Sequence, residues 1–137
     1  MGLVLDSSVV IAAERRGENV VQLLRRIADN FSDQQCVLSA IGVTELVHGI
    51  YRAPNPAVRS RREVFIKELI SRVEIHPYSS TTALLAGRID GEQQNRGIVI
   101  PFVDLMIGAT ALEIGYSIVT TNIRHFRLIP NLAVSEL

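Results

Sequence analysis

The stretch that decides the fold is Leu3-Val4-Leu5-Asp6-Ser7-Ser8-Val9-Val10, where an apolar strand pattern gives way to a helix start at one acidic residue. Residues 3–6 predict a short buried strand, and Ser7 and Ser8 supply a helix-start signal ahead of an apolar segment that ends near Gly17. The chain therefore opens with a strand followed by a helix, the unit from which parallel α/β sheets are built.

The same alternation continues along the chain. Hydrophobic periodicity and capping residues predict helices at 18–31, 39–52, 57–71, 79–97 and 101–114 and a short turn at 122–126. Strands are predicted at 36–38, 73–75, 116–120 and 132–134, the last at a sheet edge. We expect an α/β fold with a short central parallel sheet flanked by helices. A chain of 137 residues suits one core, so residues 1–137 are interpreted as a single domain.

Composition narrows the class of protein. Apolar residues make up 47% of the chain and aromatic residues only 5%, which favours a core of Ala, Val, Ile and Leu. Cys36 is the only cysteine, so an intrachain disulfide and a multi-cysteine zinc site are excluded, and a cytoplasmic location is expected. The apolar run 98–119 contains Pro101, Asp104 and Glu113, which favours a buried helix and strand over a membrane span.

Polar residues recur where strands end. Asp6 ends the first strand, Glu45 lies in the helix after the second, Asp104 lies in the first helical turn after Pro101, and Asn122 follows a later strand. The carboxyl ends of parallel strands share one edge of a sheet, where ligands bind. We expect these side chains to converge there.

Each acid also has a simpler interpretation. Asp6 is a common helix cap, and Asp104 is a first-turn acid that the helix dipole would stabilise. However, Asp104 and Glu45 have apolar neighbours, and no Lys or Arg occupies a helical neighbour position of Glu45. Burying unpaired carboxylates is costly, so a shared divalent cation is the better hypothesis. Oxygen ligands favour Mg²⁺ or Mn²⁺, and the natural reaction is phosphodiester hydrolysis.

The net charge of zero says nothing about a polyanionic partner, but the distribution of charge is uneven. Residues 52–72 are rich in Arg, which makes forked contacts with phosphate. Arg61 and Arg62 are therefore candidate contacts to the phosphates of a substrate. A solvated helix face with local ion pairs explains the same cluster equally well.

Four motifs together resemble the PIN-domain nucleases, in particular the VapC toxins of toxin–antitoxin pairs. They are Leu3-Val4-Leu5-Asp6-Ser7-Ser8-Val9-Val10, Ser39-Ala40-Ile41-Gly42-Val43-Thr44-Glu45-Leu46, Pro101-Phe102-Val103-Asp104-Leu105-Met106-Ile107-Gly108-Ala109-Thr110-Ala111-Leu112 and Val119-Thr120-Thr121-Asn122-Ile123-Arg124-His125-Phe126. The resemblance covers nearly the whole chain. It implies a PIN fold, cleavage of single-stranded RNA with Mg²⁺ or Mn²⁺, a homodimer, and inhibition by a VapB-like antitoxin.

The resemblance also assigns roles to residues. It implies that Asp6, Glu45 and Asp104 are catalytic and metal-binding acids, and that Asn122 stands where many PIN domains have a fourth acid. The amide at that position puts a second metal ion in doubt. Ser8 and Thr121 match small hydroxyl residues near the acids.

Two other functions compete with the nuclease. A phosphoacceptor or phosphatase would also use a strand-end Asp with Mg²⁺, but Ser7 and Ser8 stand where a second Asp is expected, and the only lysine, Lys67, lies in a mid-chain helix. A catalytically idle PIN-like module that binds RNA or protein would keep the acids for stability alone. Metal-dependent cleavage that is lost in an acid variant separates the enzyme from the idle module.

Overall fold

The central sheet is parallel throughout and has the strand order β3-β2-β1-β4-β5. The computed structural model describes residues 1–32 and 34–137. The strands are β1 (Gly2–Leu5), β2 (Gln35–Ser39), β3 (Glu74–His76), β4 (Ser117–Thr120) and β5 (Val134–Glu136). The predicted α/β class and parallel sheet are confirmed.

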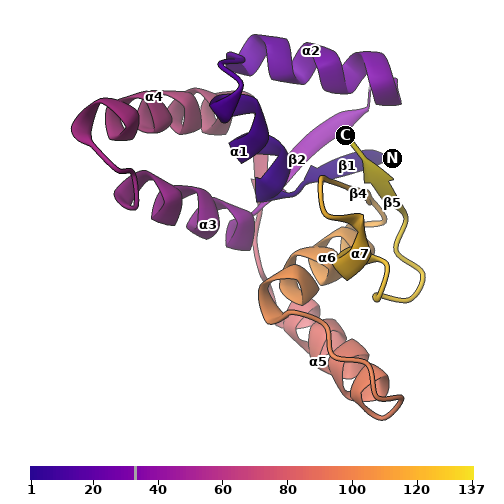
Figure 1. The fold of residues 1–137 in the computed structure, drawn as a ribbon. Helices are drawn as coiled ribbons and strands as arrows, with labels where there is room; N and C mark the ends of the chain where they lie inside the picture. Colours follow the sequence, from indigo (N-terminus) through magenta and orange to yellow (C-terminus); the bar gives the residue numbers. More distant parts are fainter. Residues whose placement is uncertain (33) are drawn as a thin grey trace.

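Helices cover both faces of this sheet (Figure 1). They are α1 (Ser7–Arg15), α2 (Val20–Phe31), α3 (Ala40–Tyr51), α4 (Pro56–Arg72), α5 (Ser80–Gln94), α6 (Phe102–Ile114) and α7 (Ile123–Phe126). Side chains alternate along β1, so Leu3 and Leu5 pack with α1 to α4, while Val4 joins a second core cluster with α5, α6 and α7. A strand buried on both faces must be apolar throughout, as the opening motif is.

Strand order fixes where the site lies. The chain runs from β1 through β2 to β3 on one side and then returns to place β4 on the other side of β1. The order therefore reverses between β1 and β4, and in parallel sheets ligands bind at the carboxyl ends of the strands at such a point. Helices α1 and α3 begin at this edge because each follows a strand directly. Helix α6 precedes β4, so its first turn lies at the same edge.

Most predicted elements lie within a few residues of those observed. The last strand is shifted by two residues, because it spans Val134–Glu136 rather than 132–134. Its polar residues at an open edge give little periodic signal. The apolar run 98–119 forms α6 and β4, and no helix in the described part of the chain has the length and apolar character to cross a bilayer.

Candidate active site

Asp6 directly follows β1 and is only 5% exposed. It occupies the N-cap position of α1, but its side chain makes no capping hydrogen bond. Its Oδ2 instead accepts hydrogen bonds from the hydroxyl groups of Ser8 at 2.7 Å and Thr120 at 2.8 Å. The simpler interpretation, in which Asp6 caps the helix, is therefore wrong for this carboxylate.

The same two hydroxyl groups also bind the backbone that follows β4. Ser8 Oγ accepts the backbone N–H of Thr121 at 3.1 Å, and Thr120 Oγ1 accepts that of Asn122 at 2.9 Å. Each hydroxyl thus donates to Asp6 and accepts from the backbone. Ser8 lies at the site as the sequence predicts, whereas the hydroxyl that reaches Asp6 from β4 is that of Thr120. Thr121 contributes its backbone, and its side chain is exposed.

Glu45 lies in the second turn of α3 and is half-buried. Its Oε1 accepts a hydrogen bond from Ser7 Oγ at 2.7 Å. Burial raises the pKa of Glu45, the Ser7 bond opposes that rise, and the charges of Asp6 and Asp104 add to it. The charges of Asp6 and Asp104 thus act on Glu45, as expected if the three acids lie at one edge of the sheet. The contact between Ser7 and Glu45 could not be predicted from the sequence, because it depends on the packing of α1 beside α3.

Asp104 lies in the first turn of α6, and its side chain is 19% exposed. Its Oδ2 is 2.8 Å from His125 Nδ1 in α7. Burial raises the pKa of Asp104, the hydrogen bond with His125 lowers it, and the charge of Asp6 raises it. Like Glu45, Asp104 therefore holds its proton more tightly than an ordinary carboxyl.

His125 Nδ1 also lies 3.0 Å from the side-chain amide of Asn122. When Asp104 is ionised, Nδ1 must carry a proton to donate to it, and the amide must then turn its oxygen toward the ring. Asn122, which stands where a fourth acid is common, is exposed and meets Asp104 through this shared histidine. His125 was not among the residues predicted for the site, and its spacing of three from Asn122 is its only local signal.

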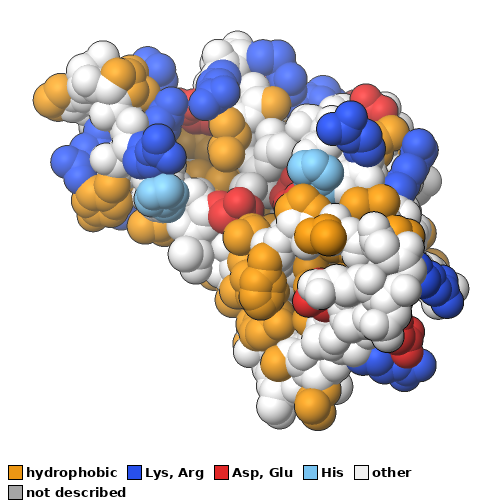
Figure 2. Space-filling view, turned by 60° about the horizontal axis from the view of Figure 1, so that its bottom comes forward, with side chains coloured by type: hydrophobic (Ala, Val, Ile, Leu, Met, Phe, Trp, Pro, Cys, Tyr) orange, Lys and Arg blue, Asp and Glu red, His pale blue; other side chains and the backbone are white. Residues whose placement is uncertain are grey.

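Cationic partners are missing from the three acids. In residues 1–32 and 34–137, every ion pair of an Arg or Lys involves a different carboxylate, and only His125 pairs with this group, through Asp104. Figure 2 shows acidic side chains near the middle of one face, with basic side chains above them and on both sides. Mutual repulsion without a counter-charge leaves the cluster in need of a cation.

The donor set fits Mg²⁺ or Mn²⁺. Three carboxylates supply hard oxygen ligands, and no thiolate takes part. Within the described ranges, no three His, Cys, Asp or Glu side chains lie close enough to form a ready-made metal cage. Mg²⁺ usually keeps several waters and takes only one or two protein carboxylates directly, so an open cluster of this kind suits it.

The two predicted RNA contacts lie on α4 and pair with Glu14 of α1. Arg61 Nε is 3.4 Å and Arg62 Nε is 3.8 Å from the Glu14 carboxylate. Arg62 also donates to the backbone oxygen of Gly49 at 3.0 Å and is 22% exposed. Arg62 therefore fixes α4 against α1 and α3, while the side chain of Arg61 is 64% exposed.

Known proteins are similar to this chain in sequence. Residues 3–132 match the PIN domain family. The chain is 32% identical to "Ribonuclease VapC1" of Rickettsia felis, over 98% of this chain and 95% of the relative. It is 28% identical to "tRNA(fMet)-specific endonuclease VapC" of Salmonella typhimurium, over 78% of this chain and 79% of that one.

A solved structure gives the same answer for the fold. A chain of the VapBC2 crystal structure from Rickettsia felis, bound to a promoter DNA fragment, superposes with a TM-score of 0.84 at 22% identity, covering 99% of this chain and 98% of that chain. The predicted PIN-like fold is confirmed. The family match over residues 3–132 and the 32% identity to a relative along nearly its whole length show the family. The chain belongs to the PIN domain family and, within it, to the VapC ribonucleases.

Proposed function

We propose that this protein is a metal-dependent endoribonuclease and the toxin of a VapBC-type pair, acting through Asp6, Glu45 and Asp104. The observation that carries the proposal is the group of Asp6, Glu45 and Asp104, in which neighbouring carboxylates raise the pKa of Glu45 and of Asp104 and none of the three has an Arg or Lys partner in the described chain. The names of the curated relatives supply the substrate class, RNA. The proposal treats residues 1–137 as one nuclease domain.

Each residue has a separate task in this proposal. Asp6, Glu45 and Asp104 would hold Mg²⁺ or Mn²⁺, which when bound neutralises phosphate charge and makes water a better nucleophile. Ser8 and Thr120 fix the orientation of Asp6, and Ser7 fixes that of Glu45. Such fixed donors let the carboxylates keep their geometry as charge develops on the scissile phosphate.

His125 and Asn122 form the outer rim of the site. His125 orients Asp104 through Nδ1, and the side-chain amide of Asn122 lies beside the same ring atom. Asn122 is exposed, so its amide is also available to the substrate. An amide adds no charge to the cluster, which favours a site with one strongly held cation.

Cleavage of a labelled single-stranded RNA by purified protein tests the function. We expect cleavage with Mg²⁺ or Mn²⁺, none with excess chelator, and none for Asp6→Asn even with metal. The matched control is Asp29→Asn, because Asp29 is an exposed acid on α2 outside the cluster. Undiminished cleavage by Asp6→Asn would remove the cluster from the mechanism.

The same experiment addresses the idle-module alternative. A PIN-like module that only binds RNA or protein would leave the labelled RNA intact under every metal condition. Phosphoryl transfer to Asp6 has less support, because Lys67 pairs with Glu63 on α4 and no lysine lies at the cluster. The nuclease remains the function that the acids support best.

The relatives in the same family also indicate which protein partner and which RNA substrate to expect. The related R. felis structure contains VapBC2, so we expect an antitoxin partner here, and an Arg of that partner would satisfy the carboxylates through forked hydrogen bonds. A homodimer remains a prediction from the family. Among RNA substrates, transfer RNA is the first to test, because one relative is named for tRNA(fMet) cleavage.

A further inference from the structure

A cleft of about 470 Å³ opens beside the acid cluster, between α1, α3 and the start of α4. Ser7 and Glu45 form one end of it, so the cleft is continuous with the proposed active site. Its other walls carry four basic or imidazole side chains: Arg15, His48, Arg52 and Arg62. An acidic reaction centre thus adjoins a basic channel.

The four side chains differ in what they already contact. Arg62 is held by Glu14 and by the backbone oxygen of Gly49. Arg15 and Arg52 are exposed, and neither forms an ion pair with any carboxylate in residues 1–32 and 34–137. His48 is exposed one helical turn after Glu45. Two guanidinium groups and an imidazole are therefore available to a ligand.

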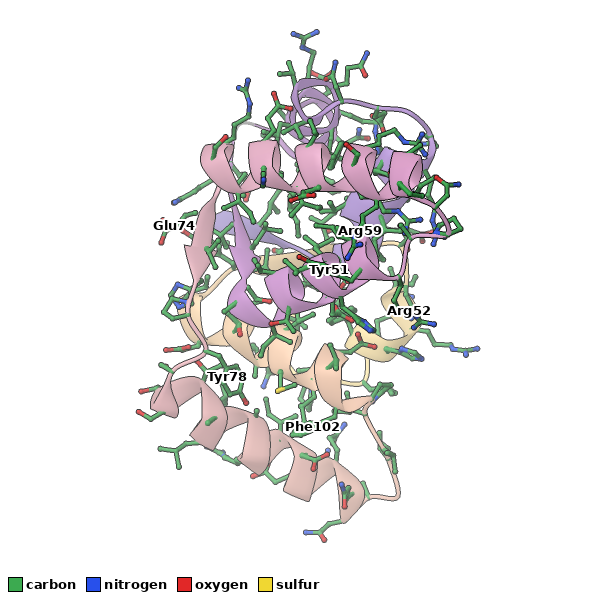
Figure 3. The ribbon with its side chains drawn as sticks, turned by 90° about the vertical axis from the view of Figure 1, so that its left-hand side faces the viewer. Tyr51, Arg52, Arg59, Glu74, Tyr78 and Phe102 are labelled. Carbon is green, nitrogen blue, oxygen red and sulfur yellow. The ribbon has the colours of Figure 1, made fainter. Side chains whose placement is uncertain are left out.

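Position in the fold keeps these groups apart from the acids. Arg15 lies in the last turn of α1, and Arg52 is the C-cap residue of α3, so each is attached at the far end of a helix whose first turns carry Ser7 or Glu45. Figure 3 shows Arg52 beside Tyr51, over whose ring Arg59 is stacked at 4.3 Å from the centroid. The guanidinium of Arg59 thus already has a partner, whereas that of Arg52 forms no ion pair in the described chain.

We propose that this cleft binds the backbone phosphates of single-stranded RNA next to the scissile bond, with Arg15 and Arg52 as the main contacts and His48 nearer to Glu45. The inference rests on the proposed nuclease function. Arg makes forked contacts with phosphate oxygens, and a channel that leads to the acids offsets their repulsion of a polyanion. Another large cleft, of about 430 Å³, also carries Arg88 and Arg96 but is lined by none of the three acids.

The assignment replaces Arg61 and Arg62 as the principal contacts. Reversing those two charges would place new carboxylates beside buried Glu14, so folding and binding would change together. Arg15 and Arg52 have no ion pair to lose, which makes their replacement by Gln a cleaner probe.

The experiment measures binding of a fluorescent single-stranded oligoribonucleotide to Asp104→Asn, a background chosen to prevent cleavage. Adding Arg15→Gln and Arg52→Gln should weaken binding and lower the slope of log affinity against log salt by about 0.7 for each lost contact, measured between about 50 and 200 mM salt. The matched control adds Arg25→Gln and Arg96→Gln, two exposed residues that are also without ion pairs in the described chain and lie outside this cleft. The control should keep the affinity and slope of its parent.

Three results would overturn the inference. Unchanged affinity and slope in the Arg15/Arg52 variant, while the wild-type protein cleaves RNA, would reject the cleft but leave the nuclease standing. Failure of the wild-type protein to cleave and of the parent to bind would reject both proposals. Loss of binding to poly-glutamate but not to RNA would make the cleft a docking surface for an acidic protein segment. Equal melting temperatures of the variants and their parent exclude misfolding as the cause of weaker binding.

Discussion

The two ends of α1 carry buried carboxylates in opposite surroundings. Glu14, near the carboxyl end, is 7% exposed and pairs with Arg61 and Arg62. Asp6, at the amino end, is 5% exposed, and its carboxylate accepts hydrogen bonds from the hydroxyls of Ser8 and Thr120. Within residues 1–32 and 34–137, cations thus pair with Glu14 and none pairs with Asp6.

The pKa values of other acids show the same division. The hydrogen bond from Arg26 holds the pKa of Glu18 below its ordinary value. Burial and neighbouring acids raise the pKa of Glu45 and of Asp104. Glu18 is therefore stabilised in its charged form, whereas Glu45 and Asp104 are destabilised in it. The second condition is typical of functional sites.

The largest expected effect is the loss of cleavage in Asp104→Asn. Removing a metal-binding charge at the reaction centre should lower the rate by at least about 10²-fold. The melting temperature of the metal-free protein should hold or rise, because one repulsive charge leaves the cluster. Single-turnover cleavage and thermal unfolding measure the two effects. A large fall in melting temperature would place Asp104 with Glu14 as a structural acid.

His125 offers a sharper test, because one variant can keep its contact with Asp104. His125→Leu removes Nδ1 and should reduce cleavage or Mg²⁺ affinity by about 10–100-fold. His125→Asn should restore most of the loss, since its amide nitrogen is as many bonds from the backbone as Nδ1 is. The Mg²⁺ concentration for half-maximal cleavage distinguishes them. Equal loss in both variants would mean that the ring itself, and not Nδ1, is required.

At the other end of α1, Glu14→Gln should reduce stability and spare chemistry. It leaves Arg62 without its charged partner, which should lower the free energy of unfolding by about 1–3 kcal/mol. Urea unfolding measures this, and cleavage per folded molecule should stay constant. The control is Glu92→Gln, whose exposed pair with Arg88 should change stability by less than about 0.5 kcal/mol. Equal stability of Glu14→Gln and wild type would remove the contrast between the two ends.

The smallest expected effect is a dependence of stability on pH. Because the pKa values of Glu45 and Asp104 are raised on folding, the folded chain binds more protons than the unfolded chain between the ordinary and the raised values. These groups therefore make the metal-free protein less stable as pH rises through that window. Cation affinity should change in the opposite direction, since the ligands must ionise.

The control for this pH effect is Asp104→Asn, in which the fall in stability with pH should be smaller than in wild type. Urea unfolding between about pH 4 and pH 7 compares the two proteins. Parallel curves would show that Asp104 is ionised as easily in the folded chain as in the unfolded one.

Sequence periodicity predicted the fold well because each strand and helix has a local signature. The position of the acids at one edge of the sheet could also be predicted, since the carboxyl ends of parallel strands meet there whatever their distance along the chain. The hydrogen bonds that hold these acids in place could not be predicted from the sequence. Ser7 meets Glu45 and His125 meets Asp104 only once α1 packs beside α3 and α7 beside α6.

The basic residues illustrate the same limit. Residues 52–72 contain a cluster of Arg, yet Arg62 and Arg61 turn toward Glu14, and Arg59 stacks on Tyr51. Arg15 lies far from that cluster in sequence but shares a cleft with Arg52. Charge density along a chain does not reveal which cations already have partners, because tertiary packing decides that.

The central claim is that Asp6, Glu45 and Asp104, which have no Arg or Lys partner in the described chain, bind a divalent metal ion. Thermal unfolding with added Mg²⁺ or Mn²⁺ tests this claim most directly. A ligand that binds only the folded state raises the melting temperature in proportion to the logarithm of its concentration above Kd. Wild-type protein and Glu14→Gln should show the same increase, and Asp104→Asn should show little or none. An equal increase in Asp104→Asn would contradict the claim that these carboxylates bind the metal ion.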